Sequence, residues 1–123
     1  MLNTIVVTTA LPLGFSSFVT NVGVKDTTKD FTVVMADGPC SAAGVFTQSR
    51  FAGPSVVISR RNVADLSARA VVVISKNANV ATGDEGMRHA EEVTSSVAAA
   101  LGLNSSEVLI ASTGVIGRLY PIE

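Results

Sequence analysis

The segment Ser112-Thr113-Gly114, at the end of an apolar run near the C-terminus, has the residue types best suited to chemistry. A threonine hydroxyl beside a glycine N–H can stabilise the oxyanion of an acyl-transfer reaction, and glycine lets the backbone approach a reacting group closely. A turn that simply ends a strand explains the same letters. The segment also lacks the lysine of a phosphate-binding P-loop. Thr113 and Gly114 are therefore candidate oxyanion donors, with an ordinary turn as the alternative.

Asn77 and Asn79 follow the apolar run 70–74. Asparagine side chains two residues apart can bond to the local backbone and hold a strand-to-helix turn. They could instead form the wall of a ligand site, since α/β proteins often bind ligands at the carboxyl ends of strands. We favour the turn. The polar residues 47–50 are interpreted as a solvated hairpin loop between two strands.

The chain contains one cysteine, Cys40, and one histidine, His89. A single cysteine cannot form an internal disulfide, and a free thiol is more typical of a reducing compartment. Because His89 is expected on the solvated face of a helix, Cys40 is interpreted as a small packing residue rather than as a nucleophile. No second ligand stands at metal-binding spacing from His89, so we expect no metal site.

The composition argues against two classes of protein. The net charge is −1 and the densest basic cluster is Arg60-Arg61, whereas a nucleic-acid binder needs clustered positive charge. No apolar run approaches the ~20 residues of a membrane helix, and the N-terminus lacks the basic region of a signal peptide. We expect a soluble, cytoplasmic protein. The charged fraction is only 15%, which suggests a large buried share or a surface covered by another segment.

The elements that would position the candidate residues form a mixed α/β domain. Short runs rich in β-branched residues predict strands over residues 4–8, 31–35, 42–46, 55–59, 70–75 and 108–111. The run 70–74 is apolar throughout, as expected of a strand buried on both faces. Apolar residues at spacings of three and four predict a helix from an N-cap at Asp84 to a C-terminal Gly102. A second, shorter helix would fit residues 62–68.

Taken together, these segments resemble the ornithine acetyltransferase (glutamate N-acetyltransferase) family. Four elements stand in the order and at the spacing of that family, and they extend over essentially the whole chain. They are Gly14-Phe15 with Gly23-Val24-Lys25, then Ala43-Gly44-Val45-Phe46-Thr47, then Asn77-Ala78-Asn79 with Ala81-Thr82-Gly83, and Ser112-Thr113-Gly114-Val115-Ile116-Gly117. Each element alone is weak, but the ordered set is specific.

The resemblance implies the N-terminal part of the α chain of an N-terminal-nucleophile enzyme, with a layered α/β, DmpA/ArgJ-like fold. Such a precursor cleaves itself before a threonine to give α and β chains. The new N-terminal threonine then carries acetyl from N-acetylornithine to glutamate as an acyl-enzyme. By this resemblance, Thr113 would offer its hydroxyl and Gly114 its N–H to the oxyanion. No cofactor is implied, although some members also accept acetyl-CoA.

The sequence departs from the family pattern in two ways. Residues 76–83 and 50–57 are closer to the paralogue of clavulanic-acid gene clusters than to most arginine-pathway members, which leaves the pathway open. The chain also ends at Glu123, before the remaining α segment, the nucleophilic threonine and the β chain. We therefore expect a single, incomplete α/β domain over residues 1–123 that is inactive alone. Its partners would be the missing segments, in a hetero-oligomer when complete.

Two other functions stay open on the sequence. The chain could be a non-catalytic binding or assembly module that kept the fold, in which case it would fold cooperatively without a downstream partner. It could also belong to a related N-terminal-nucleophile amidohydrolase or aminopeptidase. The Asn-Ala-Asn and Ser-Thr-Gly-Val-Ile-Gly elements argue against that second alternative.

Overall fold

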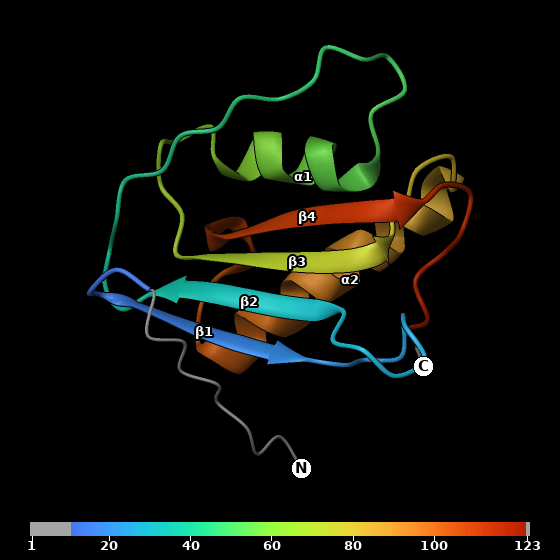
Figure 1. Cartoon of the computed structure of the whole chain (residues 1–123). Helices are drawn as coiled ribbons and strands as arrows, with labels where there is room; N and C mark the ends of the chain where they lie inside the picture. Colours follow the sequence, from blue (N-terminus) through green and yellow to red (C-terminus); the bar gives the residue numbers. More distant parts are fainter. Residues whose placement is uncertain (1–10, 123) are drawn as a thin grey trace.

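The computed structural model describes residues 11–122, in which a four-stranded sheet packs against two helices (Figure 1). In chain order the elements are β1 (Phe15–Thr20), β2 (Phe31–Ala36), α1 (Pro54–Asn62), β3 (Ala70–Asn77), α2 (Gly83–Leu101), the 3-10 turn η1 (Ser105–Glu107) and β4 (Val108–Val115). The predicted mixed α/β class is confirmed. The strand predicted over residues 4–8 lies outside the described residues.

The strands lie across the sheet in the order β1-β2-β3-β4. Neighbouring strands are antiparallel from β1 to β3, whereas β3 and β4 are parallel. A parallel pair needs a long crossover connection, and α2 with η1 supplies it. The carboxyl ends of β3 and β4, which include the Asn77 and Thr113-Gly114 segments, therefore lie side by side at one end of the sheet.

Helix α2 lies across one face of the sheet, and α1 lies along the outer edge of β4 and contacts α2 (Figure 1). The core between these elements consists mainly of small and branched apolar side chains. Its buried members are Val33, Ile58, Ala70, Val72, Ile74, Ala90, Ala98, Val108, Ile110 and Tyr120. Within residues 11–122, no helix combines the length and the apolar character needed to cross a membrane.

Helix α2 ends as predicted but differs at its start and on one flank. The N-cap is Thr82 rather than Asp84, which lies in the first helical turn. The helix ends at Leu101 and is capped by Gly102, whose φ of 69° is the left-handed conformation that glycine favours. His89, however, is only 9% exposed, so its prediction as a solvated residue is wrong. Because α2 contacts α1 as well as the sheet, more of its surface is buried than the face formed by its apolar residues.

Helix α1 replaces the strand that was predicted over residues 55–59. Pro54 fits the first helical turn, where its missing N–H leaves no bond unmade. The buried Ser59 hydroxyl donates to the Ile110 carbonyl (2.7 Å) and accepts from the Ile110 N–H (2.8 Å). One turn later, Asn62 Nδ2 donates to the Val108 carbonyl (2.9 Å). Polar side chains on α1 thus provide hydrogen-bond partners for the backbone at the outer edge of β4. A pattern of apolar residues in the sequence cannot reveal such contacts.

Three other segments differ from their predictions. Residues 42–46 form an exposed loop rather than a strand, with only an isolated bridge nearby between Ser41 and Ser67. Residues 47–50 are an exposed loop, but they lead into α1 instead of a second strand. The segment 62–68, which would fit a helix, contains only the last residue of α1 and then a turn. Strand β1 was missed because its serines dilute the apolar pattern.

The face of the sheet opposite α2 carries no helix among the described residues (Figure 1). Along β3, Ala70, Val72 and Ile74 are buried, whereas Val71 and Val73 point the other way and are only partly buried. The prediction that β3 is buried on both faces is therefore wrong for this part of the chain. We call this surface the open face. From the strand register it includes Val34, Val71, Val73, Leu109, Ala111 and Thr113.

Candidate functional site

A β-bulge joins the carboxyl ends of β3 and β4. Up to Lys76, which pairs with Gly114, the parallel register is regular, but Asn77 pairs with both Thr113 and Val115. Lys76 has a φ of 78° and Gly114 a φ of 134°. Bulges bend a strand locally and change the direction of its side chains. This bulge places the two predicted oxyanion donors directly beside Lys76.

Gly114 is the tightest point of the bulge. A Cβ atom at this position would lie 2.1 Å from the carbonyl carbon of Lys76 and 2.3 Å from its oxygen. No side chain fits there unless one strand moves. The positive φ also disfavours any residue with a Cβ. Gly114 therefore meets two separate requirements that only glycine satisfies.

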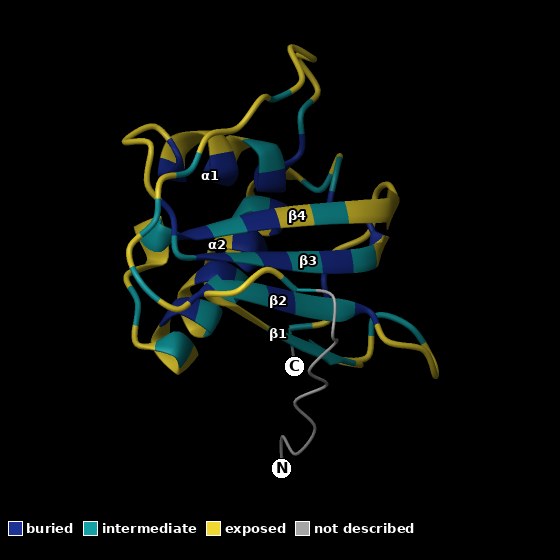
Figure 2. Ribbon diagram, turned by 60° about the vertical axis from the view of Figure 1, so that its left-hand side comes forward, coloured by how far each residue is buried: buried dark blue, intermediate teal, exposed yellow. Residues whose placement is uncertain are grey.

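Side chains on either side of the bulge point in opposite directions. The Ser112 hydroxyl donates to the carbonyl of Asn77 and ties the two strands together. The next residue, Thr113, is exposed on the open face, and Gly114 is exposed as well. Figure 2 shows the end of β4 as exposed. The Thr113 hydroxyl and the Gly114 backbone thus meet solvent at the same end of β4.

Asn77 and Asn79 hold the connection between β3 and α2. Asn77 Oδ1 accepts from the Asn79 N–H (2.7 Å), and its Nδ2 donates to the carbonyl of Leu119 (3.0 Å). Asn79 is fully buried, with Nδ2 donating to the Gly86 carbonyl (2.8 Å) and Oδ1 accepting from the Thr82 hydroxyl (2.8 Å). The interpretation of both asparagines as turn residues is confirmed, and Asn77 also lines an adjoining cavity.

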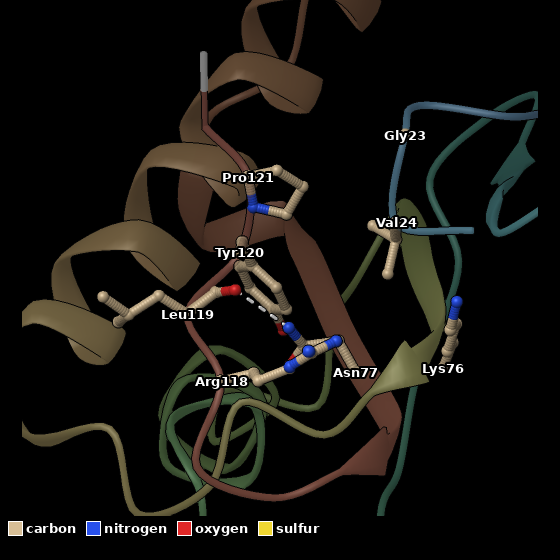
Figure 3. Close-up of a pocket in the computed structure, with 8 residues that line it drawn as sticks. All are labelled: Gly23, Val24, Lys76, Asn77, Arg118, Leu119, Tyr120 and Pro121. Carbon is tan, nitrogen blue, oxygen red and sulfur yellow. Dashed lines mark hydrogen bonds between the residues drawn. The ribbon is translucent and has the colours of Figure 1, made fainter. Parts of the chain in front are cut away.

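That cavity has a volume of about 340 Å³ and lies beside the bulge (Figure 3). Three segments line it: residues 23–24 between β1 and β2, residues 76–77 at the end of β3, and residues 118–121 after β4. Neither Thr113 nor Gly114 belongs to the lining. The cavity is connected to them through Lys76 and Asn77, which pair with them in the sheet.

The wall from the β1–β2 connection is fixed by a buried carboxylate. Asp30, 2% exposed, accepts hydrogen bonds from the N–H groups of Val22 (2.8 Å) and Lys25 (2.6 Å) and from Asn21 Nδ2 (3.2 Å). Charge-assisted bonds of this kind are stronger than neutral ones. Residues 23–24 lie between these anchors, so the wall that they form has a defined position.

Tyr120 separates the cavity from the core. Its side chain is buried, and its hydroxyl makes no well-formed hydrogen bond with any residue of the range 11–122. Burial raises the pKa of the Tyr120 hydroxyl above its ordinary value, while the nearby Ser112 and Asn79 side chains oppose that rise. Tyr120 is therefore neutral at physiological pH.

The cavity carries positive charge from Lys76 and Arg118. In the described part of the chain, neither side chain forms an ion pair or a side-chain hydrogen bond, and no acidic residue lines the cavity. Figure 3 shows Arg118 extending towards the end of β3, where Asn77 and Lys76 lie. The N-terminus of α2, which is the positive end of its helix dipole, also lies near this end of the sheet.

The structure separates the remaining candidate residues from this site. Cys40 is partly buried near the other end of β3, with Sγ 3.0 Å from the Ala68 carbonyl. No three histidine, cysteine or acidic side chains gather in a metal-binding group within residues 11–122. The sequence reasoning missed Lys76, Arg118 and Tyr120. A usable signal was present, since Lys76 directly precedes the Asn-Ala-Asn element and Arg118 directly follows Gly117.

The family model described as the ArgJ family matches residues 16–123. The chain therefore belongs to the ArgJ family. It is 57% identical over 113 residues to glutamate N-acetyltransferase Oat2 of Streptomyces clavuligerus. The matched region covers 91% of this chain and 29% of that protein. It is 56% identical over 112 residues to arginine biosynthesis bifunctional protein ArgJ 2 of Nostoc sp., again with 91% and 29% covered. The chain thus spans less than a third of the length of these curated relatives.

Two crystal structures have the same fold as this chain over part of their length. Ornithine acetyltransferase from Mycobacterium tuberculosis, complexed with ornithine, matches with a TM-score of 0.87 and 32% identity, covering 90% of this chain and 61% of that chain. Arginine biosynthesis bifunctional protein ArgJ from Bacillus halodurans matches with a TM-score of 0.85 and 29% identity, covering 89% and 58%. The four-stranded α/β sheet is therefore a part of the fold of these larger proteins.

Proposed function

We propose that this chain is part of a glutamate N-acetyltransferase and contributes the oxyanion hole. In the first half-reaction, a threonine on a segment outside the chain attacks the acetyl group of N-acetylornithine, so that an ester forms as the amide bond breaks and ornithine leaves. In the second, the amine of glutamate displaces the threonine and takes the acetyl group. The support is the family, the similarity to a glutamate N-acetyltransferase and the site geometry. The chain alone is inactive because the nucleophile lies elsewhere.

The observation that carries this proposal is the placement of Thr113 and Gly114 together at the exposed end of β4. In each half-reaction the acetyl carbonyl oxygen becomes negatively charged. A hydroxyl and an N–H that are already in position lower the energy of that charge without reorganising, and one such donor contributes about 10²–10³ in turnover. Thr113 supplies the hydroxyl and Gly114 the N–H.

The direction of the strand supports the role of the Gly114 amide. The Ile110 N–H points to the outer edge of β4, where it donates to Ser59. Backbone N–H groups alternate between the two edges of a strand, so the amides of Ser112 and Gly114 follow on the same outer edge. α1 occupies the first part of that edge, and Gly114 lies at its exposed end.

The open face supports the proposal that the chain is one incomplete α/β domain. Its partly buried valines form an apolar surface, whereas the residues of β3 on the other face, Ala70, Val72 and Ile74, are buried. Apolar patches of this kind commonly mark contacts with other segments. Thr113 belongs to the same face, so a partner that covers it would bring its own residues to the oxyanion donors. The remaining α segment and the β chain, in a hetero-oligomer, are the proposed partners.

The test is to co-express this chain with the remaining segments of the enzyme and to measure acetyl transfer from N-acetylornithine to glutamate. Thr113→Val, which keeps the shape but loses the hydroxyl, should lower kcat about 10²-fold or more, whereas Thr113→Ser should retain most activity. Thr32→Val, on the same face in β2, is the matched control. Full activity of a folded Thr113→Val enzyme would contradict the oxyanion role.

The non-catalytic alternative has a separate outcome in the same experiment. A complete, well-folded protein that transfers no acetyl group would show that the fold was kept without the reaction. The chain would then be a binding or assembly module. Assays of peptide amide hydrolysis on the same protein test the amidohydrolase alternative.

A further inference from the structure

The donor pair, Thr113 and Gly114, lies in a part of β4 that α1 does not hold by hydrogen bonds. Side chains of α1 bond to the backbone at Val108 and Ile110, early in the strand. Within the described range, no α1 side chain is hydrogen-bonded to residues 112–115. The position of the donor pair therefore depends on the contacts between β4 and β3 at the bulge.

The backbone beside the donor pair has a conformation that needs support. Lys76, which pairs with Gly114, has a φ of 78°, in the left-handed region that is unfavourable for a residue with a Cβ. Strained backbone of this kind persists only where the surrounding structure holds it. The parallel register is also interrupted directly after Lys76. Contacts on both sides of this point must therefore fix the two strands relative to each other.

Two hydrogen bonds hold the donor pair against β3, one on each side of it along the chain. Directly before the pair, Ser112 donates its hydroxyl to the Asn77 carbonyl. Directly after the pair, the Val115 carbonyl accepts from the Ala78 N–H (2.9 Å). The second is a main-chain bond that does not depend on the side chains at either position. The first requires a hydroxyl at position 112.

Asn77, whose carbonyl accepts the Ser112 bond, is itself held in place. Its Nδ2 donates to the Leu119 carbonyl (3.0 Å), as Figure 3 shows, and its Oδ1 accepts from the Asn79 N–H (2.7 Å). Asn77 is buried, and the buried Tyr120 lies near Ser112. A hydrogen bond shielded from water is electrostatically stronger than an exposed one. The Ser112 hydroxyl is thus bonded to a fixed acceptor.

We propose that Ser112 is a positioning residue of the oxyanion hole. Its hydroxyl holds the end of β4 against β3, so that the Thr113 hydroxyl and the Gly114 N–H are in place before negative charge develops. The inference rests on the proposed oxyanion role and adds a residue that acts from behind the strand. Successive side chains of a strand point to opposite faces, so Ser112 points away from the open face where Thr113 meets solvent.

The experiment compares Ser112→Ala with Ser59→Ala in the assembled enzyme. Ser112→Ala should lower kcat for acetyl transfer about 10-fold with KM nearly unchanged, because displaced donors stabilise the transition state less well. Ser112→Thr, which keeps the hydroxyl, should retain most of the wild-type kcat. Ser59→Ala is the matched control, since it removes two hydrogen bonds to the β4 backbone at Ile110. It should lower the urea midpoint of unfolding at least as much as Ser112→Ala and leave kcat unchanged.

The two serine variants separate positioning from general stability. An equal loss of kcat in Ser59→Ala and Ser112→Ala would show that activity follows stability, and it would overturn the proposal. An unchanged kcat in a folded Ser112→Ala enzyme, together with a large loss in Thr113→Val, would overturn the positioning role and leave the proposed function intact. Full activity of both Ser112→Ala and Thr113→Val would instead overturn the oxyanion role on which the inference rests.

A double variant tests whether Ser112 acts through its neighbour. Residues that act together have non-additive effects when both are changed. Ser112→Ala should therefore lower kcat clearly less in the Thr113→Val enzyme than in the wild type, because one of the donors that it positions is already absent. Equal fold losses in the two backgrounds would show that Ser112 does not act through the Thr113 hydroxyl, and they would overturn the proposal.

Discussion

The two faces of the sheet carry similar side chains but differ in what covers them. Val72 is fully buried beneath α2, while its neighbour Val73 is only partly buried on the open face. Figure 2 shows buried and partly buried residues alternating along β3. Both are valines on the same strand, so the sequence cannot distinguish them. An apolar run shows that both faces favour burial, but not whether the covering element belongs to the same chain. The low charged fraction of the sequence was the one sign that the covering element could belong to another segment.

The largest expected effect comes from a charge on the open face. Val73→Lys should weaken association with the proposed partner segments about 1,000-fold or more, because an unpaired charge would be buried in the contact. Ser95→Lys, on the exposed side of α2, is the control and should not change association. Co-purification and analytical ultracentrifugation of the two variants measure this difference. Equal association would show that the open face is not the contact surface.

The bulge at the end of β4 should be nearly as sensitive. Gly114→Ala places a Cβ against the Lys76 backbone, so one strand must move, and we expect a loss of about 3 kcal/mol or more in the free energy of unfolding. Gly102→Ala also has a positive φ but meets open space, so only about 1 kcal/mol should be lost. Urea unfolding of the assembled protein compares them. Equal losses would mean that close packing at Gly114 is unimportant.

Paired truncations test the two faces directly. Val72→Ala should lower stability by about 2 kcal/mol whether or not the partner segments are present, because its cavity lies under α2. Val73→Ala should lower the free energy of unfolding much less in the isolated chain. After assembly it should lower that free energy about as much as Val72→Ala does. Hydrogen exchange of the β3 amides reports both cases. A Val73→Ala loss that is independent of assembly would remove the distinction between the faces.

The smallest effect concerns pH. Burial raises the pKa of Tyr120 in the folded chain, so the unfolded chain loses this proton first as the pH rises. The contribution to stability is therefore complete below about pH 10 and decreases above it. Tyr120→Phe should change stability little at pH 7 and should reduce the decrease at high pH. Because Tyr120 is the only tyrosine, ultraviolet titration can follow it in this chain.

Elements with strong periodicity could be predicted from the sequence. The three- and four-residue spacing of apolar residues identified α2, and continuous branched residues identified β2, β3 and β4. Helix α1 could not be recognised, because Ser59 and Asn62 are buried through hydrogen bonds to β4, a strand far along the chain. The burial of His89 was missed because it depends on packing around α2 rather than on its own helical pattern.

The candidate site was predictable only in part. Thr113 and Gly114 followed from residue chemistry and resemblance, and the role of Asn79 in the turn followed from its side chain. The cavity could not be predicted, because its walls come from three separate segments. The bulge likewise depends on the register between β3 and β4. Lys76 and Arg118 line the same cavity only because the chain after β4 returns past the end of β3.

The parallel pairing of β3 and β4 across α2 also has a consequence for the order of folding. This unit encloses most of the buried core within one continuous part of the chain. The connection between β3 and β4 is about as long as the one between β2 and β3, but it consists largely of α2, whose local helical contacts form quickly. We therefore expect the β3–α2–β4 unit to form early and to exchange its amides last, before β1 and β2 join. The backbone at Lys76 and Gly114 would then take its shape while the rest of the sheet is still unpaired.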